Sequence, residues 1–218
     1  MDGNLVAICI LKSNKQLGAN FILTPERYNP KRRMNIDSEE TILMSEVIEL
    51  ANEIITTKQG KGKDIIQINT SDAMGGYLNI NLEVTQAINS NKKILKKGDV
   101  IISRLRPYLK QVAYVDEERE EILGASTEFF VLRSRNDESI AYLVPFLLSK
   151  PAQLVFENSV EGSQHPRFKQ EDILNLQIPK SIYFNREKIS KRVAEAIVSY
   201  RIYERTIHNE IIEMNKIM

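Results

Sequence analysis

Apolar positions along the chain follow two different periods, which together predict a mixed α/β protein. Short apolar runs bounded by turn residues predict strands, and they occupy residues 64–69, 100–105, 111–115 and 128–132. Gly75-Gly76 and Lys97-Gly98-Asp99 predict turns between them. Helical spacing occurs at residues 45–57, 138–149, 152–158 and 171–176, and Ser45 resembles a helix N-cap.

The clearest periodic signal is in residues 185–218, which contain neither Gly nor Pro. Their apolar residues recur every three or four positions and predict one continuous helix, ~50 Å long at 1.5 Å per residue. The apolar stripe that we expect to dock a partner comprises Ile189, Val193, Tyr200, Tyr203, Ile207, Ile211 and Met214. A stripe of this length must be covered by another helix, so we expect pairing with a second chain or a second half. The alternative is a helix that folds back on its own domain.

These patterns predict three parts. Residues 1–36 contain a strand-like run and a polar stretch with two prolines, and they predict an N-terminal arm or linker. Residues 37–183 predict the folded domain, and residues 184–218 predict the long helix for dimerisation or partner docking.

Composition excludes several classes of site. The 218 residues include one cysteine and two histidines, too few for an internal disulfide or a Cys/His zinc site. The apolar runs are far shorter than the ~20 residues that span a bilayer, and the N-terminus lacks the basic start and apolar core of a signal peptide. We therefore expect a cytoplasmic protein that binds no membrane and no metal.

Net charge is only +1, but the positive charges are segregated. Residues 91–112 hold seven Lys and Arg residues and one Asp, and smaller basic groups lie within residues 58–63 and 167–169. A local positive field of this kind can bind a polyanion, although solvated surface loops would have the same composition. The candidate DNA-binding residues are Lys61, Lys63, Lys92, Lys93, Lys96, Lys97, Arg104, Arg106, Lys110, Gln164, His165, Arg167 and Lys169.

Motifs for catalysis are absent from the sequence. The Gly60-Lys61-Gly62-Lys63 run lacks the spacing and the Ser or Thr of a phosphate-binding loop, and neither GxSxG nor HExxH occurs. The Asp/Asn-Pro-Pro-aromatic motif of amino-methylating enzymes is also missing. We expect no catalytic residues in this chain.

Four segments occur in an order that resembles a known family. They are residues 98–107 with Gly-Asp and Arg-Leu-Arg-Pro, residues 124–133, residues 161–179 ending in Leu-Gln-Ile-Pro, and the long helix. This order is similar to that of the specificity subunits of type I restriction-modification systems, in which a target recognition domain precedes a long helix. The present chain resembles half of such a subunit, with one recognition domain and one helix.

The resemblance implies an α+β recognition domain with a twisted sheet flanked by helices, followed by one long coiled-coil-type helix. It also implies sequence-specific binding of double-stranded DNA without catalysis. The implied partners are a methyltransferase subunit, which supplies the adenine chemistry and the S-adenosylmethionine site, and a second recognition half or a second copy. A restriction/translocase subunit is a further candidate partner. Two other functions remain open: a structural adaptor that binds no DNA, and the C-terminal recognition domain of a fused methyltransferase-type restriction enzyme.

Side-chain chemistry suggests which residues read bases. Arg and Gln make the two-pronged contacts that distinguish bases, whereas Lys makes point contacts to phosphate. We expect Gln164 and Arg167, in a loop loosened by Gly162, to read bases together with Arg104 and Arg106 on one strand face. The alternative for the loop is a structural turn that positions the helix at Asp172, and the alternative for Arg104 and Arg106 is an ion pair with Glu128 or with the acidic run at residues 116–121. Phe129 and Phe130 are expected in the core.

Overall fold

The computed structural model describes residues 40–162 and 164–217, so the predicted arm at residues 1–36 lies outside the described residues. The strands are β1 Thr41–Leu43, β2 Ile48–Leu50, β3 Ile54–Ile55, β4 Ile65–Ile68, β5 Ala73–Met74, β6 Tyr77–Leu78, β7 Val84–Thr85, β8 Lys92–Leu95, β9 Val100–Ser103, β10 Val112–Tyr114, β11 Ile122–Ala125, β12 Phe129–Ser134 and β13 Gln177–Pro179. The helices are α1 Met44–Val47, α2 Leu143–Leu148, α3 Lys150–Ser159, α4 Gln170–Leu174, α5 Lys180–Phe184 and α6 Arg186–Ile217, and the 3-10 turns are η5 Thr70–Asp72 and η6 Pro107–Leu109.

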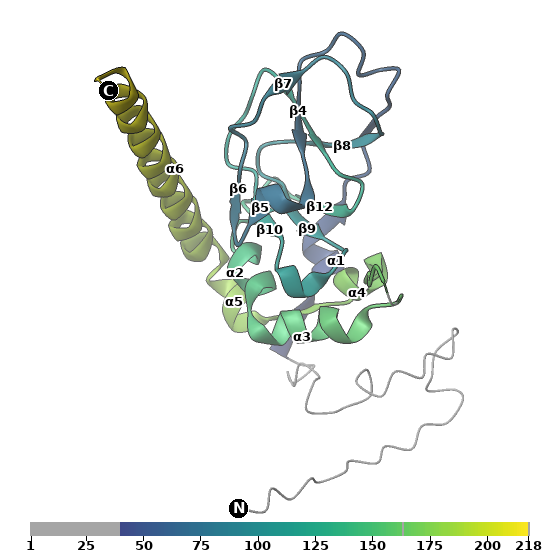
Figure 1. Ribbon diagram of the computed structural model, residues 1–218. Helices are drawn as coiled ribbons and strands as arrows, with labels where there is room; N and C mark the ends of the chain where they lie inside the picture. The colour runs from purple at the N-terminus through teal and green to yellow at the C-terminus, as the bar shows by residue number, and fades with distance from the viewer. Residues whose placement is uncertain (1–39, 163, 218) are drawn as a thin grey trace, which may run out of the picture.

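Two main sheets form the domain (Figure 1). The first has the strand order β10-β9-β12-β2, and all its pairings are antiparallel. The second has the order β3-β8-β11-β4-β7, with one parallel pairing between β11 and β4. Two further ladders have two strands each, β1-β13 and β5-β6. The expected α+β class is confirmed, with two principal sheets in place of the one expected.

The central strands β9 and β12 are buried on both faces, because successive side chains of a strand point in opposite directions. Phe129 and Val131 enter one core together with residues of the five-stranded sheet, such as Ile66. Phe130 and Leu132 enter the other core, which is covered by helices α2, α3 and α6. This double burial explains why β12 is an uninterrupted apolar run, and it confirms that both phenylalanines belong to the core.

Sequence periodicity identified four of these strands correctly. The predicted strands at 64–69, 100–105, 111–115 and 128–132 correspond to β4, β9, β10 and β12, and both predicted glycine turns are present. Strands β8 and β11 were missed, because the lysines of β8 suggested a loop and β11 follows directly on the acidic run.

The predicted helix at 45–57 is wrong. Three residues of this segment belong to the short helix α1, and it otherwise supplies edge strands to both sheets, since β2 pairs with β12 and β3 pairs with β8. Its helix-like spacing arises because Ile48, Ala51 and Ile55 enter three different hydrophobic clusters rather than one face of a helix. The β-branched side chains favour this extended arrangement.

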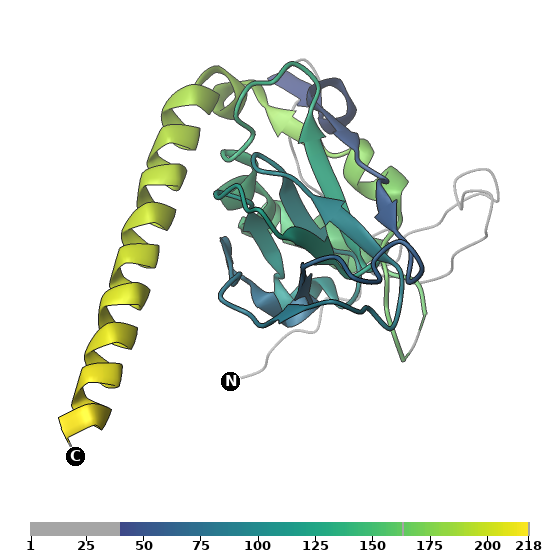
Figure 2. The ribbon, with the colours of Figure 1, turned by 90° about the horizontal axis from the view of Figure 1, so that it is seen from above.

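The predicted long helix is confirmed as α6, which runs along one side of the domain and extends past it (Figures 1 and 2). Its buried residues are Ser190, Ile197 and Arg201, and every residue from Arg205 to Ile217 is exposed. At 100° per residue the buried line lies about a quarter turn away from the apolar stripe. A polar-rich line therefore docks the helix on its own domain.

Among residues 40–162 and 164–217, no helix combines the length and the apolar character needed to cross a membrane. The same residues contain no group of three or more His, Cys, Asp or Glu side chains arranged to hold a metal ion. The boundary expected between residues 183 and 184 stays a prediction.

Candidate nucleic-acid interface

Glu128 is the carboxylate at the centre of a group of cations. It lies just before β12 and accepts a hydrogen bond at Oε2 from the Arg104 Nε, at 3.1 Å. Arg167 donates to both carboxylate oxygens, with Nε 2.9 Å from Oε2 and NH2 2.6 Å from Oε1. The hydrogen bonds from Arg167, and secondly those from Arg104, hold the pKa of Glu128 below its usual value.

Lys93 extends this group from the neighbouring sheet. Its Nζ lies 5.7 Å from the ring centroid of Phe130. Burial, and secondly the positive charge of Arg104, lowers the pKa of Lys93. The group of Lys93, Arg104, Glu128 and Arg167, called the Glu128 cluster below, thus has three cations for one carboxylate. A phosphate nearby would favour the charged form of Lys93, because an opposite charge stabilises it.

The loop before α4 is pinned rather than loose, which corrects the sequence-based expectation. Glu161 and Arg167 exchange backbone hydrogen bonds of 2.9 and 3.0 Å and so form the closed base of this loop, called the hairpin below. The Arg106 N–H donates to the Pro166 carbonyl at 2.8 Å, which ties the hairpin to the segment after β9. Buried Phe168 stacks on Phe156 at 4.5 Å and anchors the end of the loop.

Arg167 is held by its own loop and by Glu128. Its Nε and NH2 bind Glu128, and NH1 donates to the His165 carbonyl at 3.1 Å. All three nitrogens are therefore occupied, and the ion pair of Arg167 with Glu128 was not expected from the sequence. Gln164 and His165 are exposed at the tip of the hairpin.

Arg104 and Arg106 do not share a strand face, because β9 ends at Ser103. Arg104 forms an ion pair with Glu128, as in the alternative expected from the sequence. Arg106 instead has a left-handed backbone conformation with φ of 50°, at the start of η6. Lys110 ends the same turn, also with positive φ, and is exposed.

Lysines of the expected basic loop have different environments. Lys92 and Lys93 lie in strand β8 and not in a loop, and Lys92 is buried, with its stem beside Gly124. Lys92 is thus poorly placed to reach phosphate, which corrects its assignment as a DNA-binding residue. Lys96 is exposed and pairs with Glu53 at 2.7 Å.

Four further lysines complete the candidate set. Lys97 is exposed in the turn before β9. Lys61 and Lys63 are exposed in the loop that leads into β4, and no described hydrogen bond or ion pair links them to the Glu128 cluster. Lys169 pairs with Glu161 at 2.8 Å.

An open hollow of about 330 Å³ adjoins the Glu128 cluster. Its lining combines cations, carboxylates and aromatic rings, namely Arg104, Phe130, Glu161, Arg167, Phe168, Lys169, Gln170 and Glu171. A concave surface with fixed cations suits a negatively charged, partly apolar ligand.

Sequence reasoning missed two exposed apolar residues in the turn η6. Tyr108 and Leu109 are 55% and 49% exposed and stand between Arg106 and Lys110. An apolar pair between two cations is a pattern found where proteins insert side chains between the bases of a nucleic acid. The Arg-Pro-Tyr-Leu-Lys run is the signal that could have found them, although the same run is also typical of a strand exit.

The predicted docking stripe of α6 divides into two parts. Ile189 and Val193 pack against the domain core, as in the alternative of a helix folded on its own domain. The remaining five residues stay exposed, and they are Tyr200, Tyr203, Ile207, Ile211 and Met214. An apolar surface therefore persists along the outer half of the helix.

Comparison with solved structures places the fold. One similar chain comes from a structure on complex assembly and conformational transition of the type I R-M system. It has 21% sequence identity and a TM-score of 0.56, over 78% of this chain and 45% of that chain. The chain shares the fold of this type I R-M chain.

A second solved structure is the HsdS subunit from Thermoanaerobacter tengcongensis, at 19% identity and a TM-score of 0.49, over 81% of this chain and 45% of that chain. The chain thus spans less than half the length of both type I proteins. No protein-family model and no curated protein matches the sequence.

The lowered pKa of Glu128 predicts a pH-dependent contribution to stability. Because the folded pKa lies below the ordinary value of 4.5, the contribution is present above that pH and is lost as the pH falls through the folded pKa. We expect Glu128→Gln to lower the urea midpoint at pH 7 and to differ less from the wild type near pH 3. The exposed Glu118→Gln variant is the control and should match the wild type throughout. An equal loss of stability for Glu128→Gln at both pH values would contradict this assignment.

Proposed function

We propose that this chain is a half-length specificity subunit that reads one half of a split site in double-stranded DNA. The support is the fold shared with a type I R-M chain, together with the Glu128 cluster beside an open hollow. Catalysis would belong to a methyltransferase partner, which would hold S-adenosylmethionine. A restriction/translocase subunit would join the same complex.

Phosphate binding is assigned to the accessible lysines and arginines. Arg104 commits only its Nε to Glu128, so among the described residues its terminal amino groups have no hydrogen-bond acceptor. Lys96 is held only by an exposed ion pair, a kind that contributes at most about 1 kcal/mol and exchanges readily for phosphate. Lys93, Lys97, Lys110 and Lys169 would add point contacts that set the register of the protein on the duplex.

Base reading is assigned first to the hairpin before α4. Gln164 and His165 stand at its exposed tip, while its base is pinned by backbone hydrogen bonds and by Arg167. A rigid base reduces the conformational entropy that the tip loses on binding, which favours a specific contact. Gln can pair with adenine through two hydrogen bonds in the major groove.

Self-association is assigned to the outer half of α6. Its exposed stripe adjoins an open groove of about 760 Å³ between the helix and Asn79 and Asn81 of the segment after β6. A second copy of the helix would cover the stripe, giving a homodimer with two recognition domains. A second recognition half from another chain would serve equally.

Two other functions give different results in the same assays. A structural adaptor would dimerise or bind partners through α6 and would show no salt-dependent retention on duplex DNA. The recognition domain of a fused methyltransferase would bind duplex DNA as well, but its catalysis would belong to the same polypeptide and would need no separate methyltransferase subunit.

The first prediction concerns binding to duplex DNA of random sequence. Replacing Lys93, Lys96 and Lys97 together with Ala should weaken binding to all sequences about equally, because these lysines would bind phosphates. The slope of log affinity against log salt should fall by about 0.9 for each phosphate that is no longer neutralised. Fluorescence anisotropy over a salt series measures both quantities.

The matched control removes three charges elsewhere. Lys188, Lys191 and Arg192 are exposed on α6, so their triple Ala variant has the same net charge as the test variant. It should keep the wild-type affinity and slope. If both variants weaken binding alike, net charge and not this surface carries the interaction.

The second prediction concerns sequence choice. Gln164→Ala should cost ~1–3 kcal/mol on the recognised half-site and little on random DNA, because it removes a base-reading group and leaves the phosphate-binding groups in place. The assay is competition binding with the methyltransferase partner present. Gln86→Ala, at an exposed glutamine just after β7 and outside the hollow, is the control. Full half-site preference in Gln164→Ala would move the reading residues to the segment 58–77.

The third prediction concerns the dimer. Ile207→Glu with Ile211→Glu should give a monomer in sedimentation velocity at micromolar concentration, because each Glu places a charge in the apolar seam. Ile202→Glu with Ile212→Glu is the matched control, since both residues are exposed on the opposite side of the same helix. A monomeric wild-type chain at every concentration would refute self-association.

A further inference from the structure

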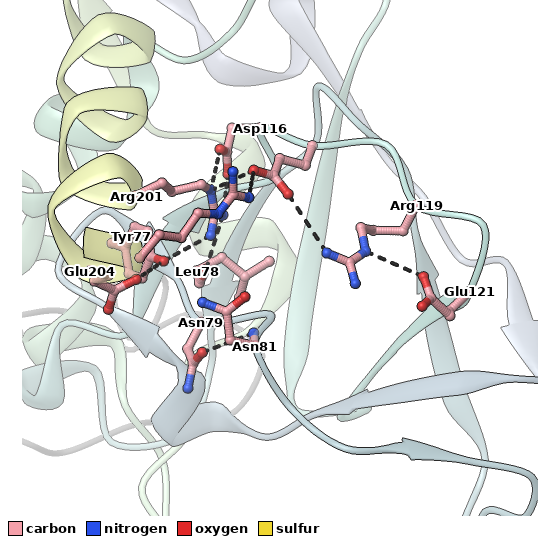
Figure 3. Close-up of polar contacts among 11 residues, drawn as sticks. Tyr77, Leu78, Asn79, Asn81, Asp116, Arg119, Glu121, Arg201 and Glu204 are labelled. Carbon is pink, nitrogen blue, oxygen red and sulfur yellow. Dashed lines mark hydrogen bonds and ion pairs between the residues drawn. The ribbon is translucent and has the colours of Figure 1, made fainter. Parts of the chain in front are cut away.

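Arg201 is the one buried cation of helix α6 among the described residues, with 4% of its surface exposed. Its Nε and NH2 donate to the two carboxylate oxygens of Asp116. NH1 donates to the Tyr77 hydroxyl at 2.8 Å and NH2 to the Leu78 carbonyl at 3.2 Å. The guanidinium also lies 4.6 Å from the ring centroid of Tyr77. Figure 3 shows this group of side chains between the helix and the domain.

A second layer of contacts surrounds this pair. The Tyr77 hydroxyl donates to Glu204, one turn further along α6. Glu117 accepts a hydrogen bond from Arg205 at 2.8 Å and lies 3.4 Å from the Arg201 Nε. The acidic run after β10 thus receives two arginines of the helix.

The charge states of Arg201 and Tyr77 are constant near neutral pH. Burial opposes the charged form of Arg201, but the hydrogen bonds and charge of Asp116 outweigh it and raise the pKa of Arg201. Burial, and then the hydrogen bond to Glu204, raises the pKa of Tyr77 above its ordinary value. Both side chains therefore keep their protons, and the contact acts as a fixed joint.

The position of Arg201 along the helix determines how far a change of angle there moves the free end of α6. It lies near the last point of contact, because every residue from Arg205 to Ile217 is exposed. The helix extends about 24 Å from Arg201 to Ile217 at 1.5 Å per residue. A tilt of about 10° at the joint would move the free end by about 4 Å, close to the ~3.4 Å rise of one base pair.

Two directional contacts hold the start of α6, namely the two-pronged pair of Arg186 with Glu138 and the hydrogen bonds of the Ser190 hydroxyl to the Tyr142 N–H and the Ser139 carbonyl, and Arg201 lies eleven residues beyond Ser190. Ile189, Val193 and Ile197 pack against the core, and apolar packing has no directional preference. A two-pronged guanidinium–carboxylate pair does have a preferred geometry. A buried ion pair often adds little net stability, so orientation is the property that this one supplies best.

We propose that Arg201, held by Asp116 and Tyr77, is the positioning residue that sets the angle between the recognition domain and α6. In a dimer joined through α6, this angle would set the spacing between the two half-sites that the complex accepts. The consequence for spacing rests on the proposed function, whereas the fixed angle does not.

The angle is tested by distance measurements between spin labels. Labels at Val84→Cys, exposed on β7, and Asn215→Cys, exposed near the end of α6, report the distance from the domain to the helix end in a Cys9→Ser background. Excess unlabelled chain suppresses distances between copies. The wild type should give one narrow distribution.

The test variant is Arg201→Met with Asp116→Asn, which removes the pair without leaving a buried charge unpaired. It should keep the helix content in circular dichroism and broaden the distance distribution, or shift it by about 4 Å. Arg205→Met is the matched control, because Arg205 is exposed and forms the outer ion pair with Glu117. A narrow distribution in the double variant, unchanged from the wild type, would overturn the proposal.

A second readout separates this proposal from the proposed function. A randomised duplex library, selected with the wild-type complex, supplies the split site, and single base-pair insertions and deletions then vary its spacer. The double variant should lose discrimination between adjacent spacers while each half-site keeps its sequence preference. A broadened distance distribution without any change in spacer choice would refute the consequence for spacing, and a library that yields no site would refute the proposed function; both results leave the fixed angle at Arg201 established.

Discussion

Strands β9 and β12 are buried on both faces, and most of the structure follows from this constraint. Alternating side chains of these strands enter two separate cores, one shared with the five-stranded sheet and one covered by helices. Since neither face can meet solvent, polar chemistry is confined to the strand ends. Arg104 follows the end of β9, and Glu128 precedes the start of β12. The candidate interface therefore lies where the doubly buried layer reaches the surface.

Ion pairs in this protein serve two different purposes. Arg167 binds Glu128 and the backbone of its own hairpin, so its role is to hold a loop in shape. Arg201 binds Asp116 at the joint of α6, so its role is to hold a helix in direction. In both cases the partner carboxylate lies on a distant segment and close to the start or end of a strand. Cations left with exposed or single contacts, such as Lys97 and Arg104, are the ones available to a polyanion.

Helix α6 has two lines of contact, a quarter turn apart. One line is polar-rich and docks on the domain through Ser190, Ile197 and Arg201, with the Ser190 hydroxyl bridging the Tyr142 N–H and the Ser139 carbonyl. The other line is apolar and stays exposed over its outer half, at residues such as Ile207 and Ile211. Because the lines do not coincide, docking on the domain leaves the apolar stripe available to a partner.

The sequence by itself determined the elements with a single dominant period, namely helix α6 and strands β4, β9, β10 and β12, because local propensity and burial agree there. It also determined that both Phe129 and Phe130 are core residues. Only the tertiary structure decided that residues 45–57 supply edge strands, because Ile48, Ala51 and Ile55 pack into three different hydrophobic clusters. It also decided which arginines are committed to carboxylates and which side of α6 docks, because those partners are separated by 24 to 85 residues in the chain. A periodic pattern records how each residue relates to its neighbours, and it contains no information about which distant segment will face it.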